Sequence, residues 1–171
     1  LINETIFGPD LQGVDVTQLM AVQSQGTTYL VASSLSGDCI RSFAIAADGT
    51  LTPVGVMGSP QGLGLTDPKG LQSVTVDGVT YLVGTASGSS SISVIAVEPD
   101  GSLRAVDHIM DTLDTRIQGV QALSVATVGD RVFVIAGGGD DGLNLFQMLP
   151  GGRLVLVATQ LQNPGLALDN I

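Results

Sequence analysis

The sequence predicts an all-β protein made of propeller blades, and three observations support this fold class. Segments of similar sequence start 52 and then 51 residues apart, at Gly26, Gly78 and Gly129. Turn pairs recur at the same spacing, and each is followed by a leucine. Short runs rich in Val, Ile, Leu and Tyr alternate with Gly, Asp and Ser, which is typical of strands. A four-stranded antiparallel unit of about 50 residues, repeated along a chain, is the signature of a β-propeller blade.

Each copy supplies four strands, which are clearest in the second copy. We expect them at residues 71–76, 80–85, 92–97 and 103–109. Asp77–Gly78 and Asp100–Gly101 tolerate positive φ, so tight hairpins are expected within the first and the last pair of strands. Residues 110–120 carry apolar side chains near helical spacing, but the repeat places them between blades, where we expect a loop with at most one helical turn. The three four-stranded blades are therefore expected at about residues 17–58, 69–110 and 120–160.

Apolar residues at equivalent positions of the three copies are expected to pack blade on blade. They are Tyr29, Val31, Ile40, Phe43 and Leu51, then Tyr81, Val83, Ile92, Ile95 and Leu103, then Val132, Val134, Leu143, Phe146 and Leu154. Burial of apolar surface contributes about 25 cal/mol per Å², so these interfaces are expected to hold the blades together.

Three blades do not close a ring, because known propellers have about 4 to 8. Apolar sheet faces would remain at both ends of the array. Two alternatives can cover them: a second copy, in a C2 homodimer that makes a six-bladed ring, or the missing part of a longer chain. Residues 1–8 align with the end of a fourth strand, so we expect an extra outer strand there. The whole chain, residues 1–171, is expected to be one partial propeller domain.

Composition excludes several classes of protein. Six basic residues face sixteen acidic ones, for a net charge of −10, and there is a single lysine, which argues against nucleic-acid binding. No apolar run approaches the roughly 18 residues of a spanning helix, so we expect no membrane insertion. The single cysteine, Cys39, excludes an internal disulfide and is expected to be a small buried apolar residue.

Two runs of sequence carry a resemblance to known families, SISVIAVEPDGSLRAV and GGGDDGLNLFQMLPGGRLVLV. They resemble repeats of bacterial propeller proteins of the lactonase-like, or YVTN-type, superfamily. They also resemble the propeller repeats of large secreted calcium-binding proteins of the haemolysin type. The first resemblance implies hydrolysis of sugar lactones at the channel mouth, although no position here matches a catalytic residue of that family. The resemblances imply a secreted or extracellular bacterial protein.

Acidic residues gather on one face of the expected propeller. The connections after the second and fourth strands share a face, and most aspartates fall in them. Carboxylate oxygens suit Ca²⁺, which takes six to eight oxygen ligands. The candidate metal ligands are Asp38, Asp140 and Asp141. The alternative is that aspartates favour turns because they bond their own backbone.

Motifs for catalysis are weak. GGGDDG matches the dinucleotide pattern GxGxxG, but a strand rather than a helix follows it, so we exclude that site. His108, the single histidine, lies beside Asp107 and could act as a general base. The repeat places it in the last strand of a blade, far from the channel, so we expect an exposed edge histidine without a catalytic role.

The sequence thus leaves two hypotheses about function. The first is a non-enzymatic propeller module for binding or structure in a secreted or surface protein, with Ca²⁺ on its acidic rim as the one cofactor expected. The alternative is a lactonase-like hydrolase of sugar lactones, whose site forms only in the assembled ring.

Overall fold

The computed structural model describes residues 15–161 and contains three four-stranded antiparallel sheets, which confirms the expected fold class. The first sheet comprises β1 (Val16–Ser24), β2 (Thr27–Ser34), β3 (Cys39–Ile45) and β4 (Leu51–Gly58). The second comprises β5 (Pro68–Val76), β6 (Val79–Ala86), β7 (Ser91–Val97) and β8 (Leu103–Met110). The third comprises β9 (Ala122–Val128), β10 (Arg131–Gly137), β11 (Gly142–Met148) and β12 (Leu154–Leu161). In each sheet the strands pair in chain order, as in a propeller blade.

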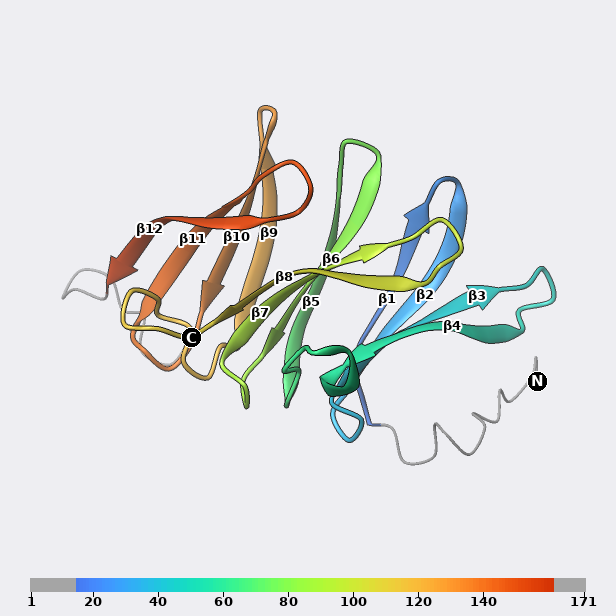
Figure 1. Cartoon of the computed structure of the whole chain (residues 1–171), viewed down its shortest axis with the longest axis horizontal. Coiled ribbons are helices and arrows are strands. Elements are labelled where there is room, and N and C mark those ends of the chain that lie inside the picture. Colours follow the sequence, from blue (N-terminus) through green and yellow to red (C-terminus); the bar gives the residue numbers. More distant parts are fainter. Residues whose placement is uncertain (1–14, 162–171) are drawn as a thin grey trace.

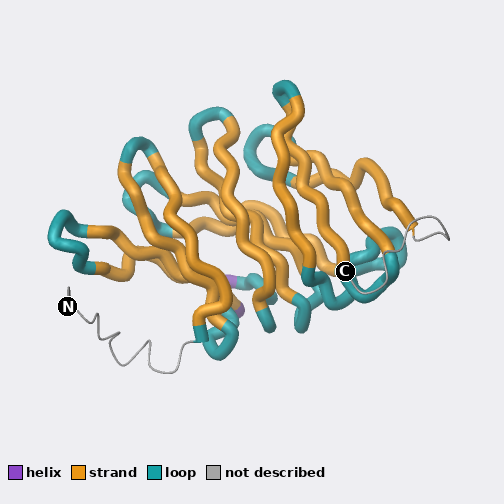
Figure 2. Tube along the Cα trace, turned by 180° about the vertical axis from the view of Figure 1, so that it is seen from behind, coloured by secondary structure: helices purple, strands orange, loops and turns teal. Residues whose placement is uncertain are grey.

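The three blades lie side by side, with the second blade between the first and the third (Figure 1). The hairpins β1–β2, β5–β6 and β9–β10 project from one side, and the connections after the second and fourth strands lie on the other (Figures 1 and 2). The first strands lie closest together, since β5 contacts both β1 and β9. The expected extra strand at residues 1–8 lies outside the described residues.

Helical structure is minimal in the described part of the chain. It consists of one 3-10 turn, Ser59–Gln61, between the first two blades. Residues 111–121 between the second and third blades form turns, as expected. No helix in residues 15–161 is both long and apolar enough to span a bilayer.

Tight turns join the first two strands of each blade, and their chemistry differs in the third blade. Asp77 and Gly78 both have positive φ, 51° and 78°, as a type I′ hairpin requires. Alignment on the repeated glycine would place Val128 at the first turn position, where a β-branched residue tolerates positive φ poorly. The turn instead uses Gly129, with φ of 63°, and Asp130, so Val128 pairs with Arg131.

This one-residue shift changes which side chains of β10 face the neighbouring blade, because successive residues of a strand point to opposite faces. Phe133, rather than Val132, takes the position of Tyr81. Val132 and Val134 pack back against the second blade, in one cluster with Tyr81. The expected equivalence of Val132 with Tyr81 is therefore wrong.

Three members of the expected packing set do not lie between blades. Leu143 of β11 is partly exposed and belongs to neither inter-blade cluster. Phe43 is buried in a small cluster on the outer side of the first blade, and Leu51 packs against that cluster.

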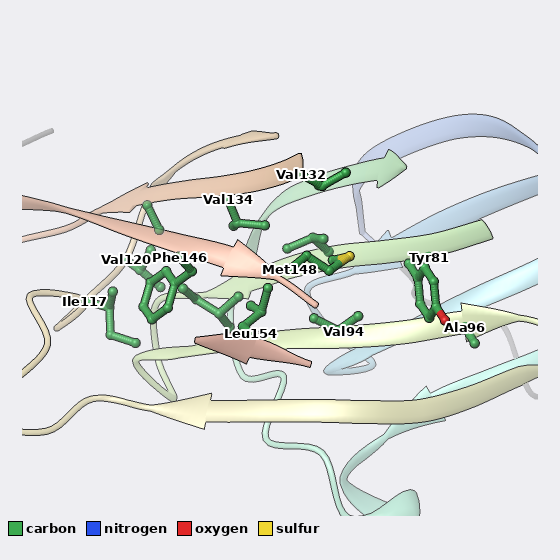
Figure 3. Packing of buried hydrophobic residues seen from close by; sticks show 13 residues of the cluster. Tyr81, Val94, Ala96, Ile117, Val120, Val132, Val134, Phe146, Met148 and Leu154 are labelled. Atoms are coloured by element: carbon green, nitrogen blue, oxygen red, sulfur yellow. The ribbon is translucent and has the colours of Figure 1, made fainter. Parts of the chain in front are cut away.

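The second blade is buried on both faces and forms the centre of the core. All seven residues of β7 are buried. Leu82, Ile95 and Val97 pack against the first blade, in one cluster with Val31 and Ile40. The alternate side chains pack against the third blade. In that second interface, Tyr81, Val94 and Ala96 meet Val134, Phe146, Met148 and Leu154 (Figure 3).

A tyrosine of each of the first two blades covers a glycine of the next blade. Tyr29 lies over Gly101, where an added Cβ would be 2.3 Å from the ring atom Cε1, and its hydroxyl donates to the carbonyl of Pro99 at 2.7 Å. Tyr81 lies over Gly152 in the same way, with a Cβ distance of 2.6 Å. We call these pairs the tyrosine–glycine contacts. They require glycine because any side chain would overlap the ring.

Cys39 at the start of β3 is buried and is not in a disulfide, as expected for a small apolar residue.

Candidate functional site

A cavity of about 370 Å³ lies where the first strands of the three blades begin. We call it the axial cavity, because in a propeller these strands surround the central axis. Its lining consists of Gln18, Lys69, Gly70, Leu71, Gln72, Gln121, Ala122 and Leu123. All three blades contribute lining residues, so a ligand bound there would contact each of the three blades.

Backbone irregularities shape two walls of the axial cavity. The pairing of β1 with β2 shifts register between Val16 and Gln18, and that of β5 with β6 shifts between Pro68 and Gly70. Such bulges add a residue to one strand and redirect its side chains, and they are common next to functional sites. Lys69 lies within the second irregularity.

Gly70 allows the strands around the cavity to approach closely. Its N–H donates to Thr85 Oγ1 at 2.9 Å. A Cβ at this position would lie 2.7 Å from Thr85 Oγ1 and 2.9 Å from Leu123 Cβ. A larger residue would therefore separate β5 from β9 and widen the cavity.

Lys69 supplies the positive charge of the axial cavity. Its Nζ lies 2.8 Å from Asp67 Oδ1, and the Ser87 hydroxyl also donates to the Asp67 carboxylate. The hydrogen bond from Lys69, followed by that from Ser87, lowers the pKa of Asp67 below 3.8. The Asp67 carboxylate is therefore ionised at neutral pH and lies beside the ammonium group of Lys69.

The chemistry of this lining suits a polar ligand. Glutamine amides both donate and accept hydrogen bonds, which matches hydroxyl groups, and an ammonium group donates to an anion or a polarised carbonyl. No Asp, Glu or His belongs to the described lining. The cavity is thus equipped for binding and for stabilising negative charge, while a general base would have to come from elsewhere.

A second cavity, of about 500 Å³, lies between the β8–β9 connection and the β10–β11 turn. Its lining consists of Asp111, Thr112, Leu113, Thr115, Arg116, Gln118 and Asp140. The Asp111 carboxylate accepts from Thr115 Oγ1 at 2.9 Å and from the N–H of Ile117 at 3.2 Å, so this aspartate organises the loop.

The candidate metal ligands lie in different blades. Asp38 belongs to the β2–β3 turn and accepts from the N–H of Asp67 at 3.2 Å. Asp140 and Asp141 lie in the β10–β11 turn, where Asp140 accepts from the N–H of Gln118 at 3.3 Å. Within residues 15–161, no three His, Cys, Asp or Glu side chains are grouped to hold a metal ion. Calcium binding by the acidic face stays a prediction.

His108 lies on β8, the outermost strand of the second blade, and lines neither cavity. It is half-buried rather than exposed. Its Nδ1 lies 2.9 Å from the hydroxyl of Ser93, and Ser93 is fully buried. Burial lowers the pKa of His108 below 6.5, and the negative charge of Asp107 partly opposes this effect. The ring is therefore neutral at pH 7, and its contacts are structural.

This lowered pKa predicts a pH dependence of stability. The unfolded chain binds the proton of His108 more readily than the folded chain does. The contribution of His108 to stability therefore falls as the pH drops below 6.5 and is constant above it. Aspartates with lowered pKa, such as Asp67, lose their contribution only around and below 3.8. We expect the melting temperature to fall between about pH 7 and pH 5, and His108→Gln to remove most of that fall. The same slope in both proteins would contradict the assignment to His108.

The residues of the axial cavity were not among those predicted from the sequence. The available signal was their place in the repeat: Gln18, Lys69 and Gln121 lie within two residues of the position where the first strand of each copy begins. The search for acidic and catalytic motifs did not select glutamines and a lysine.

Comparisons with known proteins identify structural neighbours. No protein-family model and no curated protein matches the sequence. A protein from Lactobacillus plantarum is 20% identical with a TM-score of 0.64, over 90% of this chain and 43% of that one. A candidate 6-phosphogluconolactonase from Bacteroides fragilis is 22% identical with a TM-score of 0.59, over 95% and 46%. The periplasmic gluconolactonase of Pseudomonas aeruginosa is 27% identical with a TM-score of 0.57, over 92% and 44%.

The chain spans less than half the length of these neighbours. Its structural neighbours include lactonase-like propeller proteins, which supports the first resemblance noted in the sequence. The resemblance to haemolysin-type calcium-binding repeats stays a prediction.

Proposed function

We propose that this chain is part of a propeller hydrolase that acts on sugar lactones, and that the axial cavity is its share of the substrate site. The observation that carries the proposal is the likeness to the gluconolactonase of P. aeruginosa, at 27% identity over 92% of the chain. The candidate 6-phosphogluconolactonase of B. fragilis supports the same class of substrate. Of the two hypotheses, these neighbours favour the hydrolase over the non-enzymatic module.

The chemistry of the axial cavity fits one part of this reaction. Hydrolysis of a lactone adds water to a cyclic ester, and negative charge develops on the carbonyl oxygen in the transition state. The Lys69 ammonium group, held by Asp67 at 2.8 Å, can donate to that oxygen or to an anionic substituent. The glutamines can bind the sugar hydroxyls. The group that activates water would come from the blades that complete the ring.

Hydrolysis of gluconolactone, measured by acid release above the spontaneous rate, tests the proposal. We expect Lys69→Gln to lower kcat/KM by about 10- to 100-fold, because it removes a donor to developing charge. Arg104→Gln is the matched control. Like Lys69, Arg104 is a cationic side chain in an ion pair with a carboxylate, that of Glu98 at 2.6 Å, but it lies outside the cavity. It should leave kcat/KM unchanged.

The wild-type result separates the two hypotheses. Absence of hydrolysis by a protein whose ring is complete would contradict the hydrolase proposal. Calorimetric binding of gluconate without turnover would instead support the non-enzymatic binding module. Secretion, like calcium binding, stays a prediction under either hypothesis.

A further inference from the structure

The cavity of about 500 Å³ between the second and third blades has charged groups of both signs in its lining. We call it the junction cavity, because the β8–β9 connection joins the two blades there. We propose that it binds a small zwitterion with the charged groups of a free amino acid. Arg116 takes the carboxylate, and Asp111 and Asp140 take the ammonium group. The junction cavity shares no lining residue with the axial cavity, and the proposal does not depend on the hydrolase activity.

Both walls of the junction cavity belong to described residues of adjacent blades (Figure 1). One wall is the connection of residues 111–121, which is anchored by Ile117, a fully buried side chain. The other wall is the β10–β11 turn. Gly139 donates its N–H to the carbonyl of Gln118 at 2.8 Å, and the Asp140 carboxylate accepts from the N–H of Gln118 at 3.3 Å. The cavity is therefore built into the contact between the second and third blades.

Arg116 is held in place while its charged group has no partner. Its N–H donates to Oδ1 of Asn144 at 3.2 Å, and Asn144 is fully buried. Its Cβ and Cγ lie over Gly142, where an added Cβ would be 3.4 Å and 3.3 Å away. The half-buried guanidinium group forms no hydrogen bond or ion pair within residues 15–161. A guanidinium group binds a carboxylate through two parallel N–H groups, so Arg116 is suited to that ligand group.

A buried donor beside Arg116 also lacks a partner. Asn144 Oδ1 accepts from Arg116 and from the hydroxyl of Thr159 at 3.1 Å, but Asn144 Nδ2 has no acceptor in the described residues. Buried polar groups are nearly always hydrogen-bonded, either by the protein or by a bound molecule. Both Arg116 and the residue that anchors it therefore keep an unpaired donor within residues 15–161.

The two aspartates of the lining each use one carboxylate oxygen for the local structure. Asp111 accepts through Oδ1 from the Thr115 hydroxyl and from a backbone N–H, and Asp140 accepts through Oδ2 from Gln118. Within the described part of the chain, the other oxygen of each makes no hydrogen bond, and neither aspartate forms an ion pair with Arg116. Opposite charges that line one cavity without pairing can both be paired by a ligand that carries both charges.

The equivalent junction between the first and second blades lacks these charges. Thr66 accepts at its carbonyl from the β6–β7 turn at 3.0 Å, just as Gln118 accepts from the β10–β11 turn at 2.8 Å. The two connections therefore have the same register, and Gly64, two residues before Thr66, holds the position of Arg116.

Serine hydroxyls satisfy the first junction. Ser89 and Ser91 each donate to the carbonyl of Gly64 at 2.8 Å. One repeat later, Asp140 and Gly142 replace these two serines. Three departures from the repeat thus coincide at the second junction: a guanidinium group, a carboxylate, and a glycine that leaves room for the arginine stem. Joining two blades does not require them, because the first junction does without them.

The balance of charge in the lining favours a zwitterion over a simple anion. Two carboxylates face one guanidinium group, so the lining is negative overall. A hydroxy acid would bring only negative charge into this cavity, whereas an ammonium group would be attracted by both aspartates. The hydroxyls of Thr112 and Thr115 and the amide of Gln118 can accept further hydrogen bonds from the ammonium group.

NMR titration of the 171-residue chain with the common amino acids tests the proposal. The amino acid that binds most tightly is then compared with its own hydroxy-acid and amide analogues, as L-alanine with L-lactate and L-alaninamide. We expect the amino acid to bind at least about fivefold more tightly than either analogue, and the perturbed signals to come from residues 111–118 and Asp140. Absence of binding up to about 10 mM, or equal binding of the hydroxy acid, would overturn the proposal.

Two variants remove one charge each from the cavity. Arg116→Gln and Asp140→Asn should each weaken binding of the amino acid at least about fivefold. Asparagine at position 140 keeps an oxygen that can accept from Gln118, so the turn is retained. Arg153→Gln and Asp130→Asn are the matched controls, because both residues are exposed, lie outside the cavity and undergo the same change of charge. Neither control should alter the affinity.

Combining the variants with the analogues assigns each charge of the ligand. The amide analogue has no carboxylate, so Arg116→Gln should leave its binding unchanged. The hydroxy acid has no ammonium group, so Asp140→Asn should not weaken its binding. If each variant weakens all three ligands equally, the proposed pairing of charges is wrong. Circular dichroism on each variant verifies that it folds.

Discussion

Gly101→Ala is expected to lower the free energy of unfolding by about 2–5 kcal/mol, through a backbone cost and an overlap with the neighbouring blade. Gly101 has φ of 83°, which costs a residue with a Cβ about 1–2 kcal/mol. The new Cβ would also lie 2.3 Å and 2.6 Å from two atoms of the Tyr29 ring and 2.8 Å from Val54. The ring cannot easily move, because Tyr29 is 4% exposed and its hydroxyl is bonded to Pro99. Urea denaturation measures the change.

Gly151→Ala separates the two contributions to this loss. Gly151 has φ of 85°, but no atom lies within 4 Å of an added Cβ, so only the backbone cost of about 1–2 kcal/mol is expected. Equal losses in the two variants would show that the tyrosine–glycine contact does not restrict residue size. A larger loss for Gly101→Ala would show that the contact joins the blades.

Phe146→Ala is expected to lower the free energy of unfolding by about 3–5 kcal/mol, because it leaves a cavity between the second and third blades. Phe146 is 1% exposed and packs in one cluster with Val94 and Leu154 (Figure 3). Total stabilities of about 5–15 kcal/mol are usual, so such a loss would bring the fold close to unfolding. Thermal and urea denaturation measure it.

Leu113→Ala is the control for the core substitution. Leu113 is 102% exposed, so its truncation should change stability by no more than about 0.5 kcal/mol. A small effect of Phe146→Ala would mean that the third blade is not held by apolar packing against the second. Comparable effects of the two substitutions would lead to the same conclusion.

Both substitutions act at contacts between blades, where residues from successive repeats meet; the hydrogen bonds between blades described next join residues 57 and 70 positions apart in sequence. Tyr29 reaches Pro99 and Gly101, and Thr80 Oγ1 donates to the carbonyl of Gln23 at 2.5 Å. Within a blade the contacts are mostly between successive strands joined by short turns. Stability of the array therefore depends on the interfaces, as in other repeat proteins.

The candidate site was predicted less well than the fold. The acidic connections were placed on the correct side of the blades. Asp38, however, belongs to the first blade and Asp140 to the third, so these side chains do not converge. The axial cavity depends on three first strands coming together and on the register shifts between Val16 and Gln18 and between Pro68 and Gly70. Neither feature has a local signature, since a bulge depends on the partner strand as well as on its own residues.

The sequence by itself determined the repeat, the number of strands, their meander order, the hairpins and the burial of Cys39, because alternation and turn residues act over a few neighbouring positions. Only the tertiary structure decided which face of β10 packs against which blade. The repeat aligned Gly78 with Gly129, whereas the hairpin uses Gly129 and Asp130 and brings Phe133 to the position of Tyr81. A strand shifted by one residue exchanges its two faces, and packing against another blade then selects between them.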